Sequence, residues 1–148
     1  MRIAVVAACP FPSPQGSQVF VGEMCEALVR RGHDVELLTY GQGGGSDAPR
    51  GYAHRRIRRL PGDDALRSGP TLVKPVLDAL LARALSRMLA RDRFDVVHAH
   101  NYEAGAVAVA TRMARDVPVV YHGHSVMAEE LPSYFSTRAA KRCAGLLG

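Results

Sequence analysis

The sequence of 148 residues has no tryptophan and only three cysteines. It has no apolar run approaching the roughly 20 residues that cross a bilayer, and the apolar run 3–8 is too short for most signal-peptide cores. Cys9, Cys25 and Cys143 show no paired spacing, so neither a disulfide framework nor a CxxC zinc site is indicated. We therefore expect a cytoplasmic protein with reduced thiols.

What is present fits one soluble α/β-type domain: 47% of the residues are apolar and 22% are charged. The net charge of +5 is unevenly distributed, because residues 50–93 hold eleven Lys or Arg against four Asp or Glu. Such a basic segment favours phosphate groups or acidic lipid, although a solvated surface explains it equally well. We expect no nucleic-acid partner.

Apolar patterning predicts an alternation of strands and helices along the chain. The predicted strands cover residues 2–9, 35–40, 55–60, 94–100 and 117–121, and the predicted helices cover 17–31, 72–91 and 103–115, with a further helical start from Thr137. Ser17 is the expected N-cap of the first helix, Gly32 its expected end, and Phe20, Met24, Ala27 and Leu28 its expected buried stripe. This alternation predicts an α/β fold with a doubly wound parallel sheet.

Three loops should meet at the carboxyl edge of that sheet, where ligands of such folds bind. They are PFPSPQGSQ after the first strand, HAHNYE after the fourth and YHGHS after the fifth. No GxGxxG or P-loop is present, and the second strand ends without a ribose-binding acid, which excludes a nicotinamide-binding fingerprint. The segment GQGGGSDAPRG after the second strand predicts a mobile surface loop.

The helix predicted over 72–91 carries a broad apolar stripe beside a basic one made of Lys74, Arg83, Arg87 and Arg91. Apolar stripes of this kind are most often part of a core. A basic amphipathic helix that contacts an acidic membrane has the same pattern, so peripheral attachment to the inner face of the membrane stays an alternative.

Two HxH pairs, His98 with His100 and His122 with His124, lie at predicted strand ends. Strand alternation would bring each pair to one side of the sheet. HxH pairs can bind zinc or another first-row metal, but only Glu103 lies nearby to complete a hydrolytic site. A metal-dependent hydrolase is thus the less favoured alternative, hydrogen-bonded structural histidines are another, and we expect no metal or other cofactor.

Three segments in order carry a resemblance to a known family: MRIAVVAACPFPSPQGSQVFVGEMCEALVRRGHDVELLTY, FDVVHAHNYEAG and PVVYHGHSVMAEELPSYF. They resemble the amino-terminal domain of retaining, GT-B-fold glycosyltransferases of the GT4 type. The resemblance implies a Rossmann-like domain over 1–148 that forms one half of a GT-B architecture. This half would bind a glycan, glycolipid or small glycoside acceptor in a pathway such as polysaccharide biosynthesis, while a second half binds the nucleotide-sugar donor.

The resemblance also assigns roles to individual residues. Gly16 matches the family's first-loop glycine near the donor diphosphate, and Gln18 matches a polar residue that contacts the acceptor. His124 matches the histidine that reaches the transferred sugar and is the expected catalytic residue. The acceptor cleft would be lined by His100, Asn101, Tyr102, Glu103 and Ser125, with His98 and His122 as structural neighbours.

The sequence departs from the family pattern in one respect. The family's second domain, with paired glutamates on a donor-binding helix, has no counterpart in these residues. We therefore expect a truncated domain with little transferase activity by itself. The competing hypothesis is a noncatalytic module that binds an anionic partner through the cleft or the basic segment.

Overall fold

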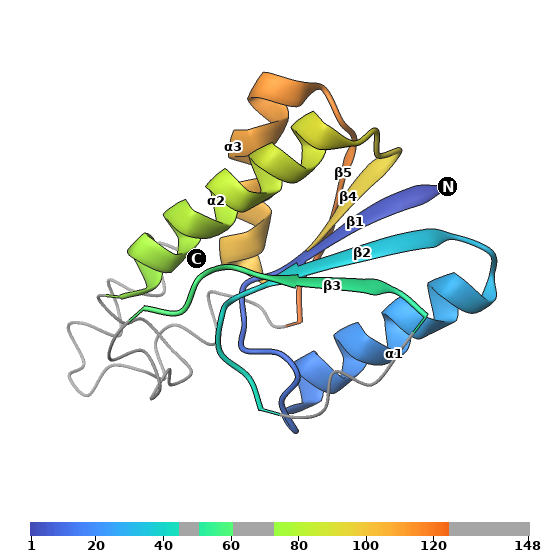
Figure 1. Cartoon of the computed structure of the whole chain (residues 1–148), viewed down its shortest axis with the longest axis horizontal. Coiled ribbons are helices and arrows are strands. Elements are labelled where there is room, and N and C mark those ends of the chain that lie inside the picture. Colours follow the sequence, from blue (N-terminus) through green and yellow to red (C-terminus); the bar gives the residue numbers. More distant parts are fainter. Residues whose placement is uncertain (45–50, 61–72, 125–148) are drawn as a thin grey trace.

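A computed structural model describes residues 1–44, 51–60 and 73–124. Within these residues the chain forms five strands and three helices, as predicted from the sequence (Figure 1). Their order is β1 (Arg2–Ala7), α1 (Gly16–Arg30), β2 (Asp34–Thr39), β3 (Ala53–Arg56), α2 (Lys74–Arg91), β4 (Val96–His100), α3 (Tyr102–Arg115) and β5 (Val119–His122). The helix predicted from Thr137 lies outside the described residues.

All the described strands are parallel and follow the order β3-β2-β1-β4-β5. The chain moves outward from β1 through β2 to β3, then crosses back over α2 to β4 on the other side of β1. This reversal confirms the doubly wound, Rossmann-like fold and places its topological switch point between β1 and β4. Helix α1 covers one face of the sheet, and α2 and α3 cover the other (Figure 1).

Alternate residues of β1 enter two separate hydrophobic cores. Ile3, Val5 and Ala7 pack on the α1 side, whereas Ala4 and Val6 pack on the side of α2 and α3. All five are at most 5% exposed. A strand buried on both faces reads as a continuous apolar run, which is why the first strand is evident from sequence.

The two ends of α1 differ in how well the sequence predicts them. Gly32 ends the helix as expected: its φ is +82°, its N–H donates to the Val29 carbonyl at 2.8 Å, and the His33 N–H donates to the Leu28 carbonyl at 3.1 Å. The predicted N-cap is wrong. Gln15 occupies that position without a side-chain cap, and the Ser17 hydroxyl donates to Gln18 Oε1 instead.

The predicted buried stripe of α1 is also wrong in part. Gln18, Val21, Gly22 and Cys25 form the buried face, and Phe20 is 40% exposed. The helix is turned so that Gly22 lies against the ring of Phe11, where a Cβ would come within 3.4 Å of that ring.

The described part of the predicted mobile surface loop after β2 is buried at its start and exposed at Gly43 and Gly44. Gly41 and Gln42 are buried, and the Gln42 carbonyl accepts a 3.0 Å hydrogen bond from the Phe11 N–H. Residues 45–50 of this segment lie outside the described residues. The third strand is shorter than predicted, because its ladder with β2 ends where Arg56 pairs with Thr39.

Candidate functional site: histidines at the carboxyl edge

The carboxyl ends of β4 and β5 bring the two HxH pairs together. His98 and His100 lie on the same face of β4, and His122 is the direct neighbour of His100 in the parallel ladder. The ring centroids of His98 and His100 are 4.4 Å apart, those of His100 and His122 are 5.2 Å apart, and those of His122 and His124 are 4.8 Å apart. We call these four residues the histidine cluster. The predicted alternation is confirmed.

Phe20 connects the first helix to this cluster. Its ring lies 4.9 Å from that of His122 and 5.4 Å from that of His124, centroid to centroid. The first turns of α1 therefore lie beside the ends of β4 and β5, as the convergence of loops predicts. The role of Phe20 in the site was missed because its spacing matched a core stripe.

A hydrogen bond orders the cluster. His100 Nδ1 lies 3.1 Å from His124 Nε2, so one of the two nitrogens carries the proton that the other accepts. His100 is fully buried, and its Nε2 has no hydrogen-bond partner among the described residues. His124 is half-buried and lies two residues after His122, the last residue of β5.

The surroundings of His98, His100 and His124 lower the pKa values of these three imidazoles. Burial, followed by the charges of His98, His124 and His122, lowers the pKa of His100 to about 3. Burial and then neighbouring histidines likewise lower the pKa values of His98 and His124. A neutral His124 can donate or accept a hydrogen bond without introducing a charge.

The amino terminus of α1 is open at its first residue. A Cβ built on Gly16 meets no atom of the described residues within 4 Å. Gln18 is 5% exposed, and its Nε2 donates to Gln15 Oε1 at 3.2 Å. Gln18 therefore orders the start of the helix in this structure, and Ser125 lies outside the described residues.

The loop after β4 places Asn101 in an unusual backbone conformation with φ 72° and ψ 157°. Tyr102 then begins α3. The Glu103 carboxylate accepts a 2.8 Å hydrogen bond from the Lys74 ammonium, and both side chains are at most 15% exposed.

A second polar cluster lies on the other face of the same edge. The Tyr40 hydroxyl donates to Asp78 Oδ1 at 2.5 Å. Burial raises the pKa values of both groups, and it raises the pKa of the Cys9 thiol to about 12. Sequence reasoning missed this pair, because Tyr40 ends a strand and Asp78 lies on a helix 38 residues away.

The chain matches the family described as the glycosyl transferase 4-like domain over residues 15–147. It belongs to this family. The resemblance to the amino-terminal, GT-B-type domain of GT4 glycosyltransferases is thereby confirmed. None of the curated protein sequences is a significant match to the chain.

Solved structures share the fold of this glycosyl transferase 4-like domain. It is similar to sucrose-phosphate synthase from Thermosynechococcus elongatus, with 16% identity and a TM-score of 0.71, over 94% of this chain and 36% of that chain. It is also similar to the calicheamicin glycosyltransferase CalG4, with 15% identity and a TM-score of 0.60, over 99% of this chain and 41% of that chain. A third similar structure is the C-terminal domain of the PF1911 hydrogenase from Pyrococcus furiosus, with 14% identity and a TM-score of 0.58, over 82% of this chain and 90% of that chain.

These structural likenesses show the fold alone, since the hydrogenase domain has it too. The domain spans 36% of the length of the sucrose-phosphate synthase chain. A role in glycosyl transfer must therefore be argued from the site.

Two members of the predicted basic stripe form ion pairs. Lys74 lies in the ion pair with Glu103, and Arg91 contacts Glu36 and Asp92. Arg83, Arg87 and Arg91 are exposed, while Leu77, Leu81, Leu85 and Met88 place the apolar stripe of α2 in the core. No helix within the described ranges combines the length and apolar character that a membrane span requires. Peripheral contact through Lys74, Arg83, Arg87 and Arg91 stays a prediction.

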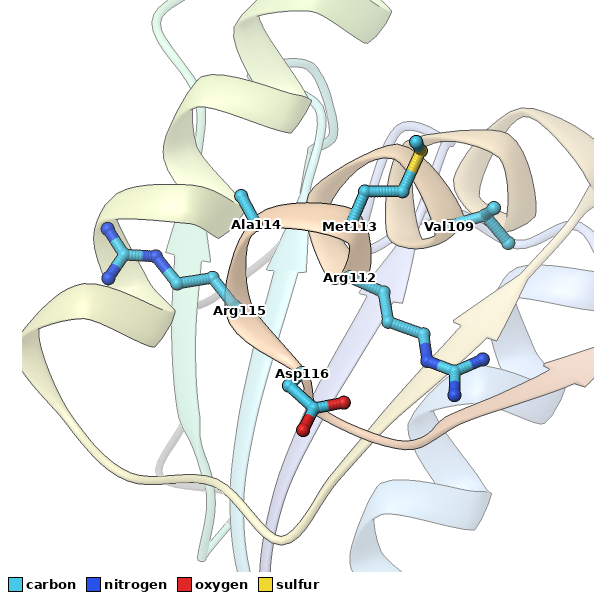
Figure 2. Close-up of a pocket in the computed structure, with 6 residues that line it drawn as sticks. All are labelled: Val109, Arg112, Met113, Ala114, Arg115 and Asp116. Carbon is cyan, nitrogen blue, oxygen red and sulfur yellow. The ribbon is translucent and has the colours of Figure 1, made fainter.

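A surface hollow of about 750 Å³ lies at the far end of α3, away from the histidine cluster. Figure 2 shows the residues that line it, which come from the second half of α3 and its C-cap: Val109, Arg112, Met113, Ala114, Arg115 and Asp116. Their side chains spread in different directions rather than converging on one point (Figure 2). The hollow therefore lacks the convergent polar groups of a binding site.

Proposed function

We propose that this domain is the acceptor-binding half of a retaining glycosyltransferase and that His124 contacts the sugar being transferred. The proposal rests on the position of His124 at the carboxyl edge of the sheet. Its Nε2 lies 3.1 Å from His100 Nδ1, and its ring contacts the ring of Phe20 in α1. The family match supports the general reaction class. A nucleotide-sugar donor would be bound chiefly by a second domain across this edge.

The open start of α1 suits the leaving diphosphate. The N-cap residue Gln15 gives no side-chain cap to the first N–H groups, and Gly16 leaves space for an anion to approach them. A helix amino terminus stabilises negative charge through these N–H groups and through its dipole. This stabilisation would grow as the bond to the sugar breaks, which is the requirement for lowering the barrier.

His124 would act on the other side of the breaking bond. A transfer with retention passes through an oxocarbenium-like state, which needs orientation of the sugar more than a proton acceptor. A neutral His124, held by His100, can hydrogen-bond a sugar hydroxyl and keep the ring in place. Asn101 and Tyr102, at the start of α3, would face the acceptor.

The experiment uses the complete protein with its donor-binding half and follows release of nucleoside diphosphate across a panel of nucleotide sugars. His124→Ala should lower kcat/KM by roughly 100-fold, the loss typical of a group that stabilises a transition state. The matched control is His33→Ala, a half-buried histidine in the turn after α1, which should stay within about twofold.

Gly16→Ala tests the diphosphate site separately. The added methyl meets no described atom within 4 Å, so the domain should fold normally while an approaching phosphate is obstructed. Weaker donor binding with unchanged acceptor KM is expected. Unchanged transfer by His124→Ala would refute the role of this residue, and a complete protein that neither binds nor turns over any nucleotide sugar would favour a noncatalytic module.

A further inference from the structure

The histidine cluster has the composition of a transition-metal site. One ring nitrogen each of His98, His100 and His122 lies within 4.8 Å of the others. Three imidazoles around a tetrahedral zinc ion have nitrogens about 3.4 Å apart, given zinc–nitrogen bonds of about 2.0–2.1 Å. Ring rotations that move each nitrogen by about 1 Å would therefore close the site around an ion.

His100 has the nitrogen that such an ion needs. Its Nε2 is buried without a hydrogen-bond partner among the described residues, while its Nδ1 is 3.1 Å from His124 Nε2. If Nδ1 donates to His124, Nε2 carries the lone pair that a metal ion requires. Metal-binding histidines are typically held in this way, by an outer partner that accepts the proton of the second nitrogen.

We propose that His98, His100 and His122 bind one zinc-class divalent ion, with His124 as the outer hydrogen-bond partner of His100. Imidazole ligands select late first-row ions such as zinc, nickel and copper over magnesium or calcium. The Glu103 carboxylate forms an ion pair with Lys74, so the proposed ligands are the three histidine nitrogens alone. The inference goes beyond the proposed function, in which the chain's own groups act without a metal.

The ion would join two adjacent strands. His98 and His100 come from β4 and His122 from β5, the last strand of the described sheet. A ligand that binds only the folded chain raises its stability. Zinc should therefore raise the thermal unfolding midpoint, a readout that does not depend on transferase activity.

The first test is calorimetric titration of the tag-free full chain with zinc chloride, together with cobalt absorption spectra that report a tetrahedral nitrogen site. One equivalent should bind. His98→Asn and His122→Asn alter half-buried rings, and each should weaken binding more than His124→Ala, for which a loss of about 10–100-fold is expected. His33→Asn should bind as the unchanged chain does.

Two results would overturn the proposal. One is a chain that binds no zinc at micromolar concentration. The other is zinc binding that persists undiminished in folded His98→Asn and His122→Asn variants, with circular dichroism verifying the fold. Zinc binding by a chain whose complete form shows no sugar transfer would support the metal site while refuting the proposed function.

Discussion

His100 is fully buried among three other imidazoles, so a proton added to it places a positive charge where water cannot solvate it. Burial and these neighbours lower its pKa to about 3 from the ordinary value of 6.5. The unfolded chain therefore binds a proton between these pH values that the folded chain does not. The contribution of this residue to stability is fully present above pH 6.5 and is lost as the pH falls toward 3.

We predict that the free energy of unfolding of the chelator-treated chain falls as the pH drops from 6.5, with a contribution from His100 of up to about 1.4 kcal/mol per pH unit. Urea titrations at several pH values measure this slope. In His100→Asn, which keeps an N–H donor for His124, the slope should be smaller. Equal slopes in the two proteins would show that His100 does not resist protonation.

Residue roles were predictable only where spacing alone decides them. The shared side of His98 and His100 follows from strand alternation, whatever the rest of the fold does. The place of Phe20 depends on how α1 is rotated about its axis, and the buried face of this helix is the one that carries Gln18, Val21, Gly22 and Cys25. The pair of Lys74 and Glu103 joins two helices, and no local pattern reveals such a partner.

At the scale of elements, the segment after β2 is fixed to the segment after β1. The Phe11 N–H donates to the Gln42 carbonyl, and the Tyr40 N–H donates to the Cys9 carbonyl at 3.2 Å. Gly43 follows with φ +131°, and a Cβ there would lie 2.4 Å from the Phe11 carbonyl oxygen. These contacts hold the first loop of the site in place.

We predict that Gly43→Ala lowers the free energy of unfolding by about 2 kcal/mol or more, because it combines backbone strain with overlap against a main-chain atom. Gly44→Ala is the matched control, since its Cβ meets no described atom within 4 Å and should change stability by less than about 0.5 kcal/mol. Equal denaturation midpoints for the two variants would contradict this account.

Element type was predictable from periodicity, and element ends were predictable only where a local signal exists. Gly32 is such a signal for the end of α1, because glycine readily adopts the positive φ found there. The end of β3 is set by its partner instead, because the ladder stops where β2 stops, at Thr39. A strand end that depends on a neighbour cannot be read from its own residues.

At the scale of the whole molecule, β1 belongs to both hydrophobic cores. Val21 and Cys25 of α1 pack on one side of it, and Leu81 of α2 belongs to the core on the other. Each of these side chains is at most 1% exposed. Because a single strand supplies alternate residues to both sides, loss of either core should release the other, and the domain should unfold in one step.

We predict that Leu81→Ala lowers the free energy of unfolding by about 2–5 kcal/mol and Val21→Ala by about 2 kcal/mol. The exposed Met113, changed to Ala, should have an effect within about 0.5 kcal/mol. Thiol labelling of the buried Cys25, read by peptide mass spectrometry, reports opening of the α1 side. Leu81 lies on the opposite side of the sheet. Leu81→Ala should nevertheless accelerate Cys25 labelling by the same factor by which it raises the equilibrium population of the unfolded chain. A Cys25 that stays protected while the helical signal falls would show that the two cores unfold separately and that β1 does not couple them.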